Sequence, residues 1–161
     1  MNDSNQIFFT IFYIFCGLMV LRSIYKTFFS KLETPQDYMK RANYAVSFFR
    51  MRNYANKVLL SALDAFDDLS EEERSFIHFQ LGVNYYQQRK NEEAVKHFDI
   101  AWPYIKKAKI PYNRIYASIV VANYNIGNKD RAREIYHYLL SKEKYDPRFG
   151  ALNYLESRIF K

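Results

Sequence analysis

The sequence predicts an all-α protein, in which an N-terminal transmembrane helix precedes a stack of about three helix pairs and a C-terminal capping helix. Gly and Pro, the residues that interrupt helices, number only four each in 161 residues. Between Ser75 and Trp102, large apolar residues recur at steps of three and four, which places them on one face of a helix. Residues 7–21 are uncharged and mostly apolar, without the polar face of a helix that lies on a soluble protein's surface, and this pattern indicates a helix inside a membrane.

The first element is a predicted transmembrane helix over residues 7–29, after a polar tail of residues 1–6. A helix of this length spans about 35 Å, enough to cross a hydrocarbon core of about 30 Å with some tilt. Arg22 and Lys26 flank its end, where long cationic side chains reach the lipid headgroups. Two alternatives remain, a cleavable signal peptide and a soluble or in-plane helix. The first usually has a basic start and a small-residue cleavage site, and the second a polar face; the segment has none of these.

Positive charge follows the uncharged stretch of residues 7–21 and does not precede it. Asp3 is the one charged residue before it, whereas five cationic residues follow within twenty positions: Arg22, Lys26, Lys31, Lys40 and Arg41. Because cationic flanks remain in the cytoplasm, we expect a single-pass membrane protein whose helical domain is cytoplasmic.

A linker over residues 30–35 leads to predicted helix pairs over residues 36–146. We expect first helices near 35–49 and 111–126 in the outer pairs, and in the central pair a first helix that starts at the capping box after Ser70 and ends at the polar joint of residues 87–91. Three apolar stripes share one spacing: Ala55, Leu59 and Ala62; Ala94, Phe98 and Ala101; Ala132, Tyr136 and Leu139. Thr34 with Pro35, and Ser70 with Glu73, are helix-start signals. We expect the second helix of the first pair to reach Asp68, and Pro103 to end or kink its helix near Ala101. Residues 147–161 are expected to form a helix that caps the stack.

The central pair resembles the tetratricopeptide repeat (TPR) family. Six residues match the family pattern in register: Leu81, Gly82, Tyr85, Ala94, Phe98 and Ala101. His78 stands where the family favours Trp, and Lys106 where it usually has Pro. The stripes repeat every 39 and 38 residues, longer than the usual period of about 34. The resemblance implies a TPR-like α-solenoid that binds a protein or peptide partner.

The resemblance also implies where the partner binds, because TPR ligands usually lie against the first helix of each pair. The positions carried over to this sequence are Lys40, Tyr44, Ser47 and Phe48; Phe76, Phe79, Val83, Tyr86 and Gln87; and Arg114, Ala117, Val121, Tyr124 and Asn125. The central set forms an aromatic floor. For Phe76 and Phe79, packing between helices is an equally good interpretation.

Patterns for catalysis, cofactors and metals are absent from the sequence. His78, His97 and His137 are isolated and lack metal-ligand spacing, and no glycine-rich phosphate loop is present. The single Cys16 allows no disulfide within this sequence. We therefore expect a non-enzymatic adaptor or scaffold, without cofactor, that supports assembly of a membrane-associated complex.

Two alternatives from other classes remain open. The first is a structural subunit of a larger membrane complex. The second is a binder of anionic lipid or nucleic acid through the basic stretch from Lys106 to Arg114, for which a solvated corner between repeats is the plainer interpretation. Nucleic acid is the partner that we least expect.

Overall fold

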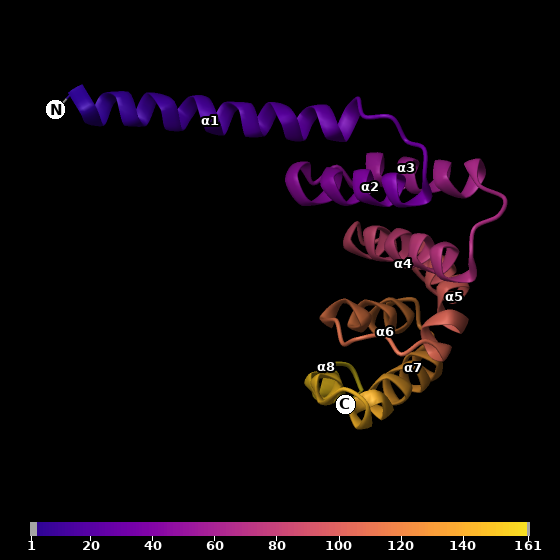
Figure 1. Ribbon diagram of the computed structural model, residues 1–161. Helices are drawn as coiled ribbons and strands as arrows, with labels where there is room; N and C mark the ends of the chain where they lie inside the picture. Colours follow the sequence, from indigo (N-terminus) through magenta and orange to yellow (C-terminus); the bar gives the residue numbers. More distant parts are fainter. Residues whose placement is uncertain (1–2, 161) are drawn as a thin grey trace. The chain divides into compact units, whose positions relative to one another are not determined.

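A computed structural model describes residues 3–160, and all of the regular secondary structure in this range is helical (Figure 1). The predicted all-α class is therefore confirmed. The α-helices are α1 Asp3–Phe28, α2 Pro35–Phe49, α3 Arg52–Ala65, α4 Glu71–Gln87, α5 Asn91–Lys107, α6 Ala117–Asn125, α7 Lys129–Ser141 and α8 Tyr154–Ile159. Three 3-10 helices accompany them: η1 Arg114–Tyr116, η2 Lys142–Lys144 and η3 Pro147–Asn153. The chain divides after Ala62 into an N-terminal and a C-terminal unit, described separately below.

The N-terminal unit begins with α1, one uninterrupted helix of 26 residues. Its stretch Gln6–Lys26 has a mean hydropathy of 2.1, and none of this stretch is buried within the protein. One N-terminal helix is therefore long and apolar enough to span a membrane. The helix already includes Asp3 to Gln6, so most of the expected polar tail is helical; Met1 and Asn2 lie outside the described residues.

The start of α2 is fixed by a capping box. The Thr34 hydroxyl accepts from the Asp37 amide, and the Asp37 carboxylate accepts from the Thr34 amide at 3.0 Å. The predicted bounds of this helix, residues 35–49, are confirmed. The next helix, α3, ends at Ala65 and not near Asp68 as expected, because residues 66–70 form a turn before the next capped helix.

The C-terminal unit contains the antiparallel pair α4 and α5. Its start is the predicted capping box, in which the Ser70 hydroxyl accepts from the Glu73 amide. The Ser75 hydroxyl donates to the Ala101 carbonyl at 3.0 Å, which ties the start of α4 to the second half of α5. Gly82 faces the ring of Phe98 so closely that an added Cβ would lie 2.5 Å from it. The close helix approach expected at Gly82 is therefore present.

Pro103 does not end α5, so the expectation that the helix could end near Ala101 is wrong. The helix continues to Lys107, with Trp102 and Ile105 buried on either side of the proline. A proline inside a helix costs about 3 kcal/mol, whereas burying two large apolar side chains contributes roughly 1.5–3 kcal/mol each. Packing of the last turn therefore outweighs the missing backbone hydrogen bond.

The third pair differs from its prediction in its first helix. Residues 111–113 are not helical, η1 starts at Arg114, and α6 occupies only Ala117–Asn125 of the expected 111–126. The Asn113 side chain accepts from the Ile115 amide at 3.0 Å, which holds the chain extended just before η1. Helix α7 then packs against α6 and buries the expected stripe of Ala132, Tyr136 and Leu139.

The C-terminal segment starts where the sequence predicts, at Asp146 and Pro147, but it begins as the 3-10 helix η3 and becomes α-helical only at Tyr154. Phe149 is fully buried, with its ring 5.3 Å from that of Tyr112 and 6.3 Å from that of Tyr116. This packing determines where η3 and α8 lie relative to α6.

A candidate partner-binding pocket

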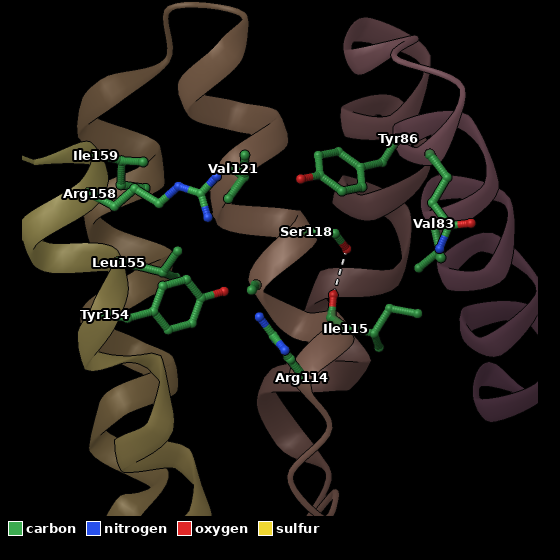
Figure 2. Close-up of a pocket in the computed structure, with 12 residues that line it drawn as sticks. Val83, Tyr86, Arg114, Ile115, Ser118, Val121, Tyr154, Leu155, Arg158 and Ile159 are labelled. Carbon is green, nitrogen blue, oxygen red and sulfur yellow. Dashed lines mark hydrogen bonds between the residues drawn. The ribbon is translucent and has the colours of Figure 1, made fainter.

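A pocket of about 230 Å³ opens in the C-terminal unit between α4, the η1–α6 segment and α8 (Figure 2). We call it the C-terminal pocket. Its lining residues are Val83, Tyr86, Gln87, Arg114, Ile115, Ala117, Ser118, Val121, Tyr154, Leu155, Arg158 and Ile159.

Six positions that the resemblance assigned to a groove line this pocket: Val83, Tyr86, Gln87, Arg114, Ala117 and Val121. They come from two successive predicted first helices. Two other assigned positions lie elsewhere in the same unit. The Phe79 ring packs 5.8 Å from Phe98 and 5.3 Å from Tyr116, and Phe76 lies against Tyr104 at 6.3 Å. The Phe79 ring follows the interpretation of packing between helices, whereas Phe76 contacts Tyr104 but remains 40% exposed.

Tyr124 and Asn125 also lie outside the pocket. The Tyr124 ring packs edge-on against Phe160 at 6.3 Å, and the Asn125 amide donates to the Asn91 side chain at 3.3 Å. In the N-terminal unit, the rings of Tyr44 and Phe48 stack at 5.8 Å and are exposed, and Lys40 is exposed on the same helix. The grouping of these three with the central positions stays a prediction.

The C-terminal pocket combines apolar walls with a few converging polar groups. Val83, Ile115, Val121, Leu155 and Ile159 form the walls, while two phenols and two guanidinium groups supply polarity. Figure 2 shows Tyr154 and Arg158 reaching from α8 toward the side of the pocket that carries Tyr86 and Arg114. None of the lining residues is acidic.

The polar side chains that line the pocket can donate hydrogen bonds. Burial raises the pKa of Tyr86, and the neighbouring Tyr154 raises it further against the opposing effect of Arg158, so its hydroxyl stays protonated at neutral pH. The Arg114 guanidinium lies 5.9 Å from the centre of the Tyr154 ring. Neither Arg114 nor Arg158 forms an ion pair within residues 3–160. Such a surface favours a ligand that accepts hydrogen bonds or carries negative charge.

Sequence reasoning missed the part of the pocket that α8 contributes. Tyr154 and Arg158 were included only in a capping helix, although they are four residues apart and therefore share a face of that helix. Leu155 and Ile159 repeat the same step one position later. A polar pair beside an apolar pair, each with a spacing of four residues, is the sequence signal that could have placed this face of α8 in a binding site.

The expectation that the histidines are isolated is wrong for two of them. His78 and His97 are nineteen positions apart in sequence, but the antiparallel pairing of α4 and α5 brings their Nδ1 atoms to 2.9 Å. The Tyr85 ring stacks on His97 at 5.4 Å. Burial lowers the pKa of both imidazoles, that of His78 to about 4, so the pair is neutral at pH 7. Within residues 3–160, no three His, Cys, Asp or Glu side chains gather as a metal site would require.

In the basic stretch from Lys106 to Arg114, Lys106 and Lys107 contact side chains of neighbouring helices. Lys107 pairs with Glu71 at 3.0 Å, and the Lys106 ammonium lies 5.6 Å from the centre of the Tyr138 ring. The Tyr138 hydroxyl donates to the Lys106 carbonyl at 2.6 Å. These contacts favour the interpretation of this stretch as a corner between helix pairs.

Fold and site together define a helical protein with an apolar N-terminal helix and an open, cationic and aromatic pocket in its C-terminal unit. No family model, curated protein or solved structure matches the chain. The functional proposal therefore rests on the pocket and on α1.

Proposed function

We propose that this chain is a membrane-anchored, TPR-like adaptor that binds a segment of a partner protein in the C-terminal pocket and supports assembly of a membrane-associated complex. The observation that carries the proposal is the pocket itself, in which apolar walls and four converging polar side chains come from three separate segments of the chain. Few polar groups on apolar walls are typical of binding sites, where the polar groups orient the ligand.

Two features support a TPR-like arrangement. Gly82 and Phe98 occupy the small and large positions of the family pattern and face each other across the α4–α5 pair. A second antiparallel pair, α6 and α7, follows directly and buries the equivalent stripe. In such arrays the partner lies along the first helices, here α4 and α6, which are two of the three walls of the pocket.

The lining residues favour binding over catalysis. They include no Asp, Glu, His or Cys to act as a general base or a reactive nucleophile. The hydroxyl of Ser118 donates to the Ile115 carbonyl at 2.6 Å, and no base lines the pocket beside it. The Tyr86 hydroxyl is protonated at neutral pH and can donate a hydrogen bond, and burial raises its pKa further from that range. We therefore propose a non-enzymatic role.

The membrane role rests on α1. Its exposed apolar surface is costly in water and is covered at no cost by lipid. The cationic residues Arg22, Lys26 and Lys31 lie at the C-terminal end of the span or just beyond it, which supports a cytoplasmic location for both units. Anchoring raises the local concentration of any membrane partner around the pocket without adding contacts.

The experiment that tests the partner site starts from the full-length chain, purified in gentle detergent, and the proteins that co-purify with it. We expect Tyr86→Ala to weaken capture of that partner about tenfold or more. Burial of one aromatic ring contributes roughly 1.5–3 kcal/mol, and about 1.4 kcal/mol is tenfold in affinity. Lys107→Ala, which changes a residue outside the pocket, is the matched control. Normal capture by Tyr86→Ala together with loss of capture by Lys107→Ala would make the basic corner the site and reject the pocket.

One observation favours the alternative of a structural subunit. Tyr44 and Phe48 expose stacked rings on α2, and Phe48 is 61% exposed. Buried interface cores are enriched in such aromatic side chains. An obligate subunit would co-purify in fixed stoichiometry and precipitate alone, whereas an adaptor stays folded and monodisperse without its partner.

A further inference from the structure

We propose that a second pocket, in the N-terminal unit, binds the phosphate of an anionic lipid headgroup. The inference rests on the proposed insertion of α1 in a membrane. The pocket encloses about 370 Å³ beside the end of α1, and we call it the basic pocket. Its lining residues are Lys26, Ser30, Lys31, Asp37, Lys40, Arg41 and Tyr44.

The charge of the basic pocket fits an anion. Four of its seven lining residues are cationic and one, Asp37, is a carboxylate. That carboxylate already accepts from the Thr34 amide, the Thr34 hydroxyl and the Glu33 amide at 3.0, 2.8 and 3.3 Å. Its hydrogen bonds are therefore used by the cap of α2. The Lys31 ammonium has a surface partner, Glu33 at 2.6 Å, and both side chains are well exposed to screening by salt.

Arg41 gives the strongest support for a bound anion, because its charge is buried and its hydrogen bonds are incomplete. It is only 9% exposed, and it makes no ion pair within residues 3–160. Its guanidinium donates to the carbonyl of Ser30 and, at 2.9 Å, to the Ser30 hydroxyl, while its Nε is buried without a hydrogen-bond partner. A buried cation without a counter-ion is unfavourable, and an anion in the adjacent pocket supplies the missing charge.

The position of the pocket identifies the anion as a lipid phosphate. The apolar stretch that can span a membrane ends at Lys26, which is itself a lining residue. Tyr25 and Phe29 flank this point with exposed rings, 61% and 70%, stacked at 6.1 Å. Aromatic rings of this kind mark the membrane–water interface. The four cations therefore lie at headgroup depth, where juxtamembrane basic clusters attract anionic lipids.

Occupation of the pocket has a consequence for the N-terminal unit. Lys26 belongs to α1, whereas Lys40 and Arg41 belong to α2, so one phosphate between them joins the membrane helix to the first helix outside it. Arginine holds phosphate through paired N–H donors, and lysine adds point charge. The lipid then orders the junction by bridging the two helices.

The test uses the full-length chain, delipidated in detergent, with three probes. These are short-chain phosphatidylglycerol, phosphatidylcholine of the same chain length, and inorganic phosphate, each titrated by isothermal calorimetry. We expect phosphatidylglycerol to bind about tenfold more tightly than either of the others. The variant Lys31→Gln with Lys40→Gln, at two exposed positions, should remove most of that preference. Lys57→Gln, an exposed lysine of α3 outside the pocket, is the matched control and should preserve it.

Equal binding of the two lipids, or an unchanged preference in the double variant, overturns the proposal. Inorganic phosphate that binds as tightly as phosphatidylglycerol also overturns it, because the site then serves a soluble anion. Alkaline carbonate extraction of native membranes separates this failure from failure of the anchor. A chain that resists extraction but shows no lipid preference contradicts only the basic pocket, whereas a released chain contradicts the anchor itself.

Discussion

At the scale of single residues, the contact between Gly82 and Phe98 determines how closely α4 and α5 approach. Phe98 is fully buried and is also in contact with the Phe79 ring at 5.8 Å, so its ring has little room to move away from α4. Glycine at position 82 is needed for this approach and not for backbone freedom, because it lies inside a helix.

We expect Gly82→Ala to lower the melting temperature of the C-terminal unit. The new Cβ would lie 2.5 Å from the Phe98 ring, and overpacking of this kind costs about 1–3 kcal/mol. Thermal unfolding followed by circular dichroism measures the change. Gly17→Ala is the matched control, since an added Cβ there meets no atom within 4 Å. Identical melts for the two variants would show that the helices do not approach at this position.

The His78–His97 pair makes the stability of the same unit depend on pH. Burial, with smaller contributions from His97 and Arg74, lowers the pKa of His78 to about 4, and burial lowers the pKa of His97 as well. Below the ordinary histidine pKa of about 6.5, the unfolded chain binds more protons than the folded chain. Stability is therefore complete above that pH and declines as the pH falls toward 4.

Between pH 7 and pH 5.5 we expect the free energy of unfolding to fall by about 1–2 kcal/mol, measured by denaturant titration of the full-length chain in detergent. Replacing both residues, His78→Phe with His97→Phe, should flatten this dependence. His137→Gln changes an exposed histidine and should leave it intact. A profile that stays equally steep in the double variant would assign the dependence to other groups.

At the scale of helices, the sequence predicts those ends that local hydrogen bonds determine. The starts of α2 and α4 follow from Thr34 and Ser70, whose capping boxes need only four consecutive residues. Ends that depend on distant packing are not predictable in this way. Helix α5 passes Pro103 because Trp102 and Ile105 are buried, and that burial depends on neighbouring helices.

The same distinction applies to the C-terminal pocket. Its α4 and α6 walls include Val83, Tyr86 and Val121, which the resemblance to the TPR family assigned to a groove along the first helices. The α8 wall was not predicted, because the position of α8 depends on Phe149 packing between rings more than thirty residues earlier in the chain. The contact of His78 with His97 escaped prediction for a similar reason.

The element-scale prediction concerns α1. We expect the full-length chain to remain in membranes washed with alkaline carbonate, because roughly twenty apolar residues are enough to hold a helix in the bilayer. A chain that begins at residue 32 should be released by the same wash. Immunoblots of pellet and supernatant measure both. Release of the full-length chain would contradict the anchor, and α1 would then need a protein partner to cover it.

At the scale of the whole molecule, we propose that one chain combines a membrane helix, a lipid-binding junction and a partner-binding pocket. The net charge of +7 is consistent with contact to acidic surfaces. The residues that line the C-terminal pocket include no acidic side chain that would repel such a surface. Each unit has its own site, so the two proposals can fail independently. The central claim is that a partner protein occupies the C-terminal pocket while α1 is in the membrane.

Site-specific photo-crosslinking in native membranes tests that claim most directly. A benzophenone amino acid introduced as Gln87→benzoylphenylalanine places the reactive group at the exposed rim of the pocket, and the same change at Lys107 places it outside. We expect irradiation to yield one discrete protein adduct from position 87 and none from position 107. Addition of Tyr86→Ala should reduce the adduct about tenfold, in line with its loss of affinity. An adduct from position 107 with none from position 87 would contradict the account.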